Sequence, residues 1–228
     1  MNKFPDVLIL IPAYNEAKRI DKVISKCTKY FDNILIINDG SNDSTLEEAI
    51  NSKANFIISH SINCGTGTSI RTGIRYFLDH TEFEYLITID ADDQHSPEDA
   101  SNILLHAINI GADAVFGSRL INAKSRRNLP FLRLILIYLA STFEQIFYGI
   151  NLTDSHNGLR VISRRACSKL KNIQSSAMAH ATEIILELRK SNIIVYEFPC
   201  NVKYGFNNKK SQSFFSSLNI ISDLFQKK

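Results

Sequence analysis

Cysteine, proline and glycine are sparse in this chain of 228 residues, which contains four, five and nine of them. The cysteines are widely scattered and form no Cys-x-x-Cys pair, so neither a disulfide framework nor a zinc site is indicated. Reduced thiols in a cytosolic compartment are the simplest interpretation. No proline- or glycine-rich linker, internal repeat or low-complexity tract divides the chain, so we expect a single domain over residues 1–228.

An excess of charge of one sign is also missing. The formal net charge is +3 with 21% charged residues, far from the basic excess of a dedicated nucleic-acid binder. Residues 1–6 run into a short apolar stretch without a signal segment, so we expect no secretion. The uncharged apolar stretch between Arg133 and Glu144 is about half of what a membrane-spanning helix needs, so we expect it not to span a bilayer.

The first half of the chain alternates between two hydrophobic periodicities. Short runs rich in β-branched residues are typical of strands, and segments with apolar residues at helical spacing lie between them. This alternation predicts an α/β fold with a mostly parallel central sheet flanked by helices. The helix before the last strand should end at Gly111. The predicted strands are 7–11, 33–38, 55–59, 85–89 and 112–116.

Clustered carboxylates, Asp90, Asp92 and Asp93, follow the fourth predicted strand directly. Open α/β sheets bind their ligands just past the carboxyl ends of the strands, and hard divalent metals prefer oxygen ligands. The alternative is an acidic turn that caps the next helix, with Ser96 as N-cap and Pro97 at the first helical position. That alternative leaves the three aspartates unexplained. The stretch therefore predicts a site for a metal and a diphosphate.

Two more loops follow the first and second predicted strands. In Pro12-Ala13-Tyr14-Asn15-Glu16, an aromatic ring and a carboxylate suit stacking on a base and hydrogen bonding to it. A turn with a helix cap accounts for Asn15 and Glu16 nearly as well. Asp39 ends the second strand, and the turn and capping chemistry of residues 40–45 does not need it. Asp39 is therefore a candidate binding residue.

Glycine and arginine mark the loops after the third and fifth strands. Gly65 and Gly67 precede a helix, which suits a phosphate or a close backbone approach. The motif Gly-x-Gly-x-x-Gly of dinucleotide-binding proteins matches poorly, because Ile70 replaces its third glycine. Arg119 ends the fifth strand, where it meets the same diphosphate or lies solvated on the surface. Five loops at one edge of one sheet predict a single site.

The second half of the chain has a different pattern of residues: a basic flank precedes the apolar residues 131–150. Two interpretations stay open for that segment: a buried helix, or an interfacial helix with its basic flank against anionic head groups. The same choice applies to residues 213–226, where core packing is the default. The flank consists of Lys124, Arg126, Arg127 and Arg133, and the second stripe of Phe214, Leu218, Ile221 and Phe225.

An ordered set of motifs covers nearly the whole chain. They are Pro-Ala-Tyr-Asn-Glu (12–16), Asp-Gly-Ser-x-Asp-x-Thr (39–45), Asn-x-Gly-x-Gly (63–67), Asp-Ala-Asp-x-Gln-His (90–95) and Gly-Ser-Arg (117–119). This set resembles glycosyltransferase family 2. Asp-Ser-His-Asn-Gly-Leu-Arg (154–160) and Glu-Phe-Pro (197–199) continue the likeness toward polyprenyl-phosphate sugar transferases such as dolichyl-phosphate mannosyltransferases.

The resemblance implies a nucleotide-diphospho-sugar transferase (GT-A) fold and a role for each matched position. Binding of the nucleotide sugar would fall to Pro12, Tyr14, Glu16, Asp39, Gly65, Asp90 and Arg119. Mg²⁺ or Mn²⁺ would be held by Asp90, Asp92 and Gln94, while Asp93 stands where the family commonly has an apolar residue. An ionised acceptor phosphate needs cations, for which Arg160, Lys203, Lys209 and Lys210 are suitable in type; the alternative is that they are solvated charges. The residues closest to the chemistry would be Asp92, Asp154 and Arg119.

The implied function is inverting transfer of a hexose from a GDP-mannose or UDP-glucose type donor to a polyprenyl phosphate, for cell-envelope glycan synthesis. Residues 1–119 would hold donor and metal, and residues 120–228 the acceptor. We expect a peripheral location at the cytoplasmic membrane face, which is compatible with a small membrane-protein partner. The alternative acceptor, a hydroxyl of a growing surface glycan, needs a base, for which Asp154 is best placed. The alternatives from other classes are a non-catalytic nucleotide-sugar-binding module and a dehydrogenase.

Overall fold

The computed structural model of the protein describes residues 4–127, 129–176 and 179–203. Lys209, Lys210 and the segment 213–226, for which the sequence predicts an acceptor contact and a helical stripe, lie outside these residues.

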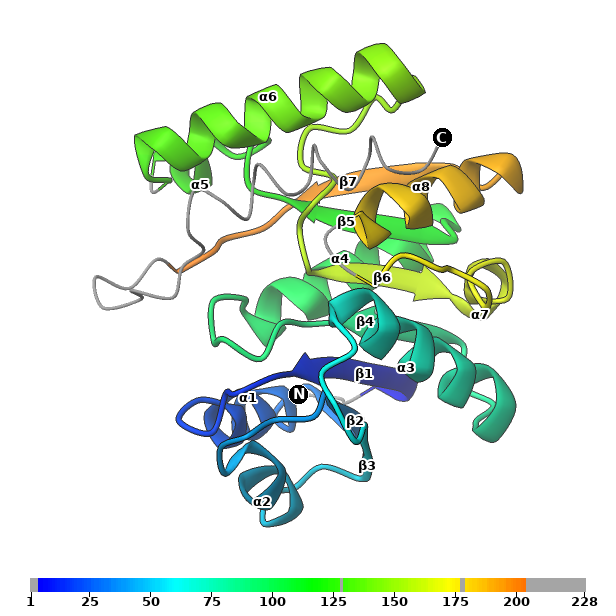
Figure 1. The fold of residues 1–228 in the computed structure, drawn as a ribbon. Helices are drawn as coiled ribbons and strands as arrows, with labels where there is room; N and C mark the ends of the chain where they lie inside the picture. Colours follow the sequence, from blue (N-terminus) through cyan, green and yellow to red (C-terminus); the bar gives the residue numbers. More distant parts are fainter. Residues whose placement is uncertain (1–3, 128, 177–178, 204–228) are drawn as a thin grey trace.

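The described residues form a seven-stranded sheet in the order β3-β2-β1-β4-β6-β5-β7 (Figure 1). All neighbouring strands run parallel except β6, which is antiparallel to both β4 and β5. The prediction of a mostly parallel sheet is therefore confirmed. Because β4 and β5 both oppose β6, they run in the same direction and end at the same edge. The strands are β1 (Phe4–Ala13), β2 (Phe31–Asn38), β3 (Phe56–Ser59), β4 (Tyr85–Thr88), β5 (Ala114–Ser118), β6 (Arg160–Ser163) and β7 (Val195–Pro199).

Helices cover both faces of the sheet (Figure 1). Val7, Ile9 and Ile11 of β1 pack with α1 and α4, while Leu8 and Leu10 pack with α3, α7 and α8. Successive side chains of a strand point to opposite faces, so burial on both faces explains why this run is continuously apolar. The helices are α1 (Ile20–Cys27), α2 (Thr45–Ile50), α3 (Thr66–His80), α4 (Pro97–Ile110), α5 (Ala123–Arg127), α6 (Phe131–Tyr148), α7 (Arg164–Cys167) and α8 (His180–Lys190).

Helix α4 begins and ends where the sequence predicts. The Ser96 side chain accepts a hydrogen bond from the Glu98 backbone N–H at 3.3 Å, and Pro97 opens the helix. Gly111 ends it in the left-handed conformation, with φ of 64°. These caps account for Ser96 to Asp99 and leave Asp90, Asp92 and Asp93 free for other roles.

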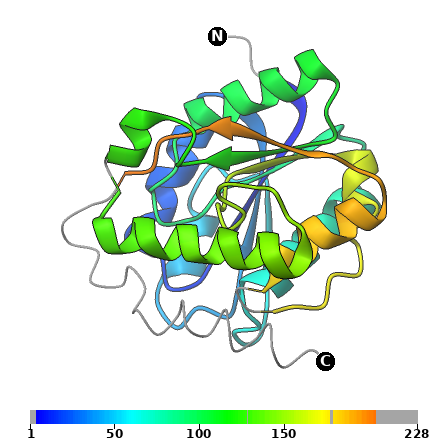
Figure 2. The same ribbon diagram turned by 90° about the horizontal axis from the view of Figure 1, so that it is seen from above.

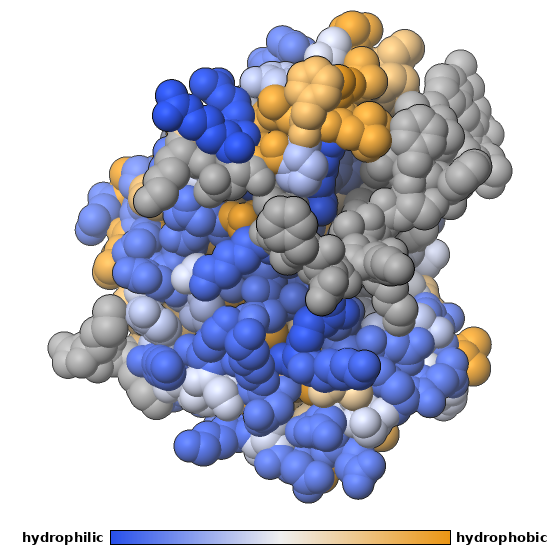
Figure 3. Space-filling model, turned by 90° about the vertical axis from the view of Figure 1, so that its left-hand side faces the viewer, coloured by the Kyte–Doolittle hydropathy of each residue, from blue (hydrophilic) through white to orange (hydrophobic). Residues whose placement is uncertain are grey.

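Helix α6 lies on the outside of the domain with most of its apolar side chains exposed (Figures 1 and 2). Phe131 is 77% exposed and Ile146 71%, and hydrophobic surface gathers where α6 lies (Figure 3). Interpretation of 131–150 as a buried helix is therefore wrong. The helix is also longer than its uncharged core: with 18 residues it is long and apolar enough, by length and composition, to cross a membrane.

Candidate functional site

The loops after β1 and β2 are joined side by side. Asn15, with φ of 56°, donates its backbone N–H to Ser41 Oγ at 3.0 Å. The backbone N–H of Glu16 donates to Thr45 Oγ1 at 2.7 Å, and the Glu16 carboxylate pairs with Arg19. Tyr14 remains 40% exposed, so its ring is available to stack on a ligand. These contacts follow from the parallel pairing of β1 and β2, which brings their carboxyl ends to one edge.

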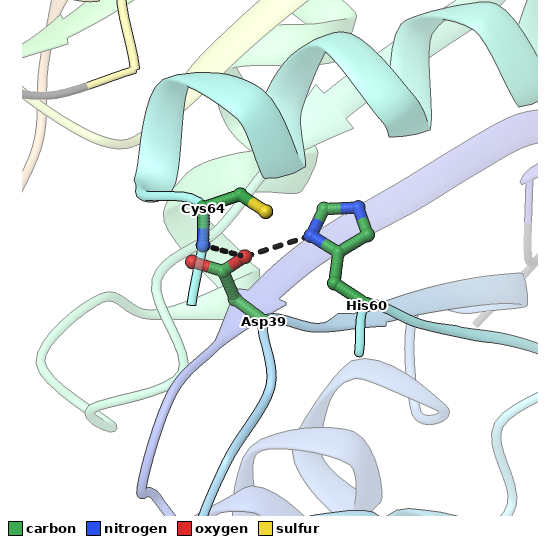
Figure 4. A group of neighbouring side chains, drawn as sticks. All are labelled: Asp39, His60 and Cys64. Carbon is green, nitrogen blue, oxygen red and sulfur yellow. Dashed lines mark hydrogen bonds and ion pairs between the residues drawn. The ribbon is translucent and has the colours of Figure 1, made fainter. Parts of the chain in front are cut away.

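Asp39 is the meeting point of three loops and is 3% exposed. Its Oδ1 accepts from the Cys64 backbone N–H at 3.0 Å and its Oδ2 from that of Gly65 at 2.8 Å. His60 Nδ1 lies 2.7 Å from Oδ1 (Figure 4). Three donors on one carboxylate fix its orientation. The structure therefore holds Asp39 as an oriented acceptor at the end of β2.

His60 is a member of the site that the sequence analysis missed. Its position one residue after β3, at the same edge as the other loops, was the available signal. Asp39, His60 and Cys64 place potential metal-binding atoms within 4.8 Å of one another (Figure 4). The second ring nitrogen of His60, Nε2, lies 3.0 Å from Thr72 Oγ1, so both nitrogens already have partners. We therefore interpret the group as a hydrogen-bonded carboxylate instead of a metal centre.

The glycines at the start of α3 allow a close backbone approach. A Cβ on Gly67 would lie 1.9 Å from the Ser175 carbonyl oxygen, and one on Gly65 would lie 2.4 Å from that of Ser176. Gly65 also has φ of 89°, which side chains rarely adopt. Packing against residues 175 and 176 explains both glycines. Of the two interpretations of this loop, close approach is thus confirmed, and a phosphate contact stays a prediction.

Asp90 and Asp92 follow β4 as a pair of interacting carboxylates. Burial and the neighbouring Asp90 carboxylate raise the pKa of Asp92. Burial alone would raise the pKa of Asp90 as well, but the nearby rings and guanidinium of His95, Arg160 and His180 outweigh it and lower that pKa. The Asp90 side chain is 44% exposed, so a ligand can reach it. A divalent cation would relieve the repulsion between the two carboxylates, so the residues fit a metal site.

His95 and Gln94 support this pair from within the loop. His95 Nε2 lies 3.3 Å from Asp90 Oδ2, and the Gln94 backbone N–H donates to Asp92 Oδ1 at 3.0 Å. His95 is 8% exposed, and its buried Nδ1 has no hydrogen-bond partner among the described residues. The Gln94 backbone carbonyl accepts from the Lys203 N–H at 3.0 Å, which places exposed Lys203 beside the aspartate loop.

Asp93 has a different task from its two neighbours. It adopts φ of 63°, and its carboxylate pairs with Lys22 at 2.7 Å and with Lys26, both on α1. Burial would raise the pKa of Asp93, but hydrogen bonds from these lysines outweigh it and lower that pKa. Asp93 therefore fastens the loop to α1, which leaves Asp90 and Asp92 as the candidate metal ligands.

Arg119 and Asp154 form a buried ion pair, with exposed fractions of 7% and 1%. Arg119 donates from Nε to Oδ2 at 2.6 Å, from its guanidinium to Oδ1 at 2.5 Å and from its backbone N–H to Oδ2 at 3.0 Å. Burial would raise the pKa of Asp154, but the Arg119 charge outweighs it and lowers that pKa. A general base works best with a pKa near the working pH. Asp154 is thus poorly suited to that role in this arrangement.

Arg160 lies inside the domain. It is 2% exposed, pairs with both β4 and β5 as the first residue of β6, and stacks over the Phe116 ring at 5.2 Å. Its Nε donates to the Asn157 carbonyl at 3.0 Å, and burial lowers its pKa to about 10. The central strand buries this guanidinium, and its contact with an acceptor phosphate stays a prediction.

Comparison with protein families matches residues 8–171 to "Glycosyl transferase family 2". A UDP-N-acetylglucosamine–dolichyl-phosphate N-acetylglucosaminyltransferase of Methanococcus voltae is 29% identical over 216 residues, covering 87% of this chain and 86% of that protein. A polyprenol monophosphomannose synthase of Mycolicibacterium smegmatis is 29% identical over 194 residues, covering 81% of this chain and 72% of that protein.

Solved structures share the fold at low sequence identity. Glucosyl-3-phosphoglycerate synthase from Mycobacterium tuberculosis, in complex with phosphoglyceric acid, superposes with a TM-score of 0.73 at 15% identity. The match covers 96% of this chain and 79% of that one. The same enzyme with Mn²⁺, uridine diphosphate and phosphoglyceric acid gives a TM-score of 0.71, at 15% identity and with 96% and 77% of the two chains covered. This likeness confirms the expected GT-A fold.

Proposed function

The chain belongs to glycosyltransferase family 2, and on that premise we propose that it transfers a hexose, with inversion, from a nucleotide diphosphate sugar to a polyprenyl phosphate. A phosphate oxygen of the acceptor would attack the anomeric carbon from the face opposite the leaving group. The bond between that carbon and the diphosphate oxygen would break, and its electron pair would leave with the nucleoside diphosphate. The names of the two relatives above support this acceptor class.

The loops after β1 to β4 suit the donor. Tyr14 and Asp39 would hold the nucleoside, together with Pro12 and Glu16, and Gly65 would line that end of the site. Asp90 and Asp92 would hold Mg²⁺ or Mn²⁺, with Gln94 as a further ligand, and the ion would neutralise charge on the leaving diphosphate. Support comes from the repulsion between the two carboxylates, which adds to burial in raising the pKa of Asp92 and which a divalent cation would relieve.

The observation that carries the choice of acceptor is the ion pair between Asp154 and Arg119. A sugar hydroxyl must lose a proton to a base, whereas a phosphate monoester arrives already charged, with a second pKa of about 6. Because both oxygens of Asp154 accept hydrogen bonds from Arg119, the pair favours the acceptor that needs no base. Lys203, beside the aspartate loop, is the described cation best placed to meet the acceptor phosphate, and Arg119 would meet the donor phosphates.

Helix α6 gives the enzyme a route to a lipid acceptor. Its exposed apolar side chains follow exposed Arg126 and Arg127 on α5. Apolar surface beside basic residues suits the anionic cytoplasmic face of a membrane, where each basic residue contributes about 1 kcal/mol to binding. We propose that α6 lies in the interface there, as a peripheral contact. The alternative is that a small membrane protein covers part of this surface.

A thermal-shift panel tests the donor site first. UDP, GDP, CDP and dTDP are added with and without Mn²⁺, and we expect metal-dependent stabilisation by at least one, because a ligand that binds the native state raises its stability. Transfer of labelled sugar is then followed into organic-extractable polyprenyl phosphate and, separately, into soluble glycan. Absence of any metal-dependent shift would contradict the donor site, and label appearing in glycan alone would contradict the acceptor.

A further inference from the structure

Helix α6 buries one side chain, and that side chain carries a charge. Among its 18 residues, all of which the structure describes, only Glu144 is buried, at 1% exposure. A buried carboxylate is costly unless it is paired or hydrogen-bonded. An apolar side chain at this position would hold the helix to the domain without that cost. The carboxylate therefore calls for an explanation beyond packing.

The contacts of Glu144 come from two separate parts of the chain. Thr182, on α8, donates its hydroxyl to Oε1 at 2.5 Å, and Ser155 donates its hydroxyl to Oε2. His156 Nε2 lies 3.2 Å from Oε1, without the geometry of a hydrogen bond. Burial would raise the pKa of Glu144, but His156 and the two hydroxyls outweigh it and lower that pKa. The charged carboxylate thus ties α6 both to α8 and to the segment before β6.

That segment, residues 153–159, contacts two residues of the proposed donor site, Arg119 and Asp90. Asp154 holds Arg119 through the buried ion pair described above. Gly158 approaches the metal pair so closely that a Cβ there would lie 2.2 Å from Asp90 Oδ2, and Thr88 Oγ1 donates to the Gly158 carbonyl at 2.6 Å. A shift of this segment would therefore move Arg119 and the space around Asp90 together.

Arg160 extends the same connection by charge. The carboxylates of Asp90, Asp154 and Glu144 all act on its guanidinium electrostatically, against the burial that lowers its pKa. Among these three carboxylates, Glu144 is the one that comes from the exposed apolar helix. No other carboxylate of α6 is present to replace it.

We infer that Glu144 is a positioning residue, which holds residues 153–159 in register with the aspartate loop and couples that register to helix α6. The inference rests on the proposed function, because it assigns α6 to the acceptor side of the transfer reaction. Glu144 touches neither substrate in this scheme. It acts through Ser155, through His156 and through the charge of Arg160.

The test replaces the carboxylate and keeps its shape. Glu144→Gln is compared with Glu187→Gln, which makes the same change on α8, where Glu187 pairs with Lys190 and its side chain is 34% exposed. Thr182→Val and Ser155→Ala remove the two hydroxyl donors singly, in case Glu144→Gln folds poorly. Four quantities are measured: metal-dependent nucleotide binding, kcat and KM for a polyprenyl phosphate, sedimentation with anionic vesicles, and amide hydrogen exchange of residues 153–159.

We expect Glu144→Gln to keep vesicle binding, to weaken metal-dependent nucleotide binding less than turnover, and to lose kcat by about tenfold or more, because small misplacement of reacting groups is costly. Its amides at 153–159 should exchange faster, and both hydroxyl variants should shift in the same direction. Unchanged exchange at 153–159, or turnover equal to that of Glu187→Gln, would overturn the inference. Equal losses of nucleotide binding and turnover would also overturn it, because they would indicate that Glu144 has only a general structural role. Failure of the wild type to bind nucleotide would instead contradict the proposed function, and the exchange measurement would still decide the role of Glu144.

Discussion

Replacing Asp154 by Asn separates an ion-pair partner from a catalytic base. The change removes the negative charge from a pair whose two side chains are buried and joined by two side-chain hydrogen bonds. Breaking a buried pair from one side costs about 3–5 kcal/mol, because the remaining guanidinium stays buried without its counter-charge. For a protein of this size, about 1 kcal/mol corresponds to about 2–4 °C in Tm, so Asp154→Asn should lower Tm by about 6–20 °C.

The assay combines thermal unfolding with turnover measured well below both melting temperatures. Asp79→Asn is the matched control, because Asp79 pairs with Lys171 while both side chains are 45% exposed, and we expect it to melt like the wild type. Asn keeps an amide oxygen that can accept from Arg119, so turnover of Asp154→Asn on polyprenyl phosphate should fall by about tenfold, as for Glu144→Gln, below the loss of about 10²–10⁴ expected on removing a general base. A variant that melts like the wild type but loses turnover to that larger extent would refute the reasoning.

The pH dependence of stability gives the same argument an independent check. The pKa of Asp154 in the folded protein lies below its ordinary value. The stabilisation from its charge is therefore fully present above the unfolded-state pKa of about 3.9 and is lost as the pH falls through the folded-state value. The difference in Tm between wild type and Asp154→Asn should stay constant from neutral pH down to about pH 5 and narrow only in stronger acid. A difference that disappears near pH 6 would contradict the assignment.

Three further predictions test other parts of the site. Asp92→Asn should abolish metal-dependent nucleotide stabilisation in the thermal-shift assay, whereas Asp93→Asn, which loses only lysine contacts on α1, should retain it; the reverse result would exchange their roles. His60→Ala removes one of the three hydrogen bonds that the Asp39 carboxylate accepts. It should weaken binding of the nucleotide sugar by about tenfold in calorimetry, since a hydrogen bond to a charged group contributes about 1.5–3 kcal/mol. Phe147→Ser, at a side chain 62% exposed on α6, should reduce sedimentation with anionic vesicles and leave nucleotide binding unchanged; equal sedimentation would contradict the docking of α6.

The framework of the proposed donor site follows from the sequence by itself. Continuous apolar runs predicted the strands, and the parallel arrangement predicted that Asp39 and the aspartate loop would meet at one edge of the sheet. The caps of α4 were also readable, because Ser96 and Gly111 act on backbone groups within a few residues of themselves. These features depend on local periodicity and on a general rule of topology, which is why they could be predicted.

Only the tertiary structure decided which polar side chains pair with which. Asp93 meets lysines of α1 that are 67 and 71 positions away, Arg160 is buried by a short strand that periodicity did not reveal, and Glu144 finds its partners on α8 and in the segment before β6. The sequence does not distinguish a charged residue that is solvated from one that is paired or bound to a metal. Its role follows from burial and from the counter-charge nearby, and both are set by contacts between residues far apart in the chain.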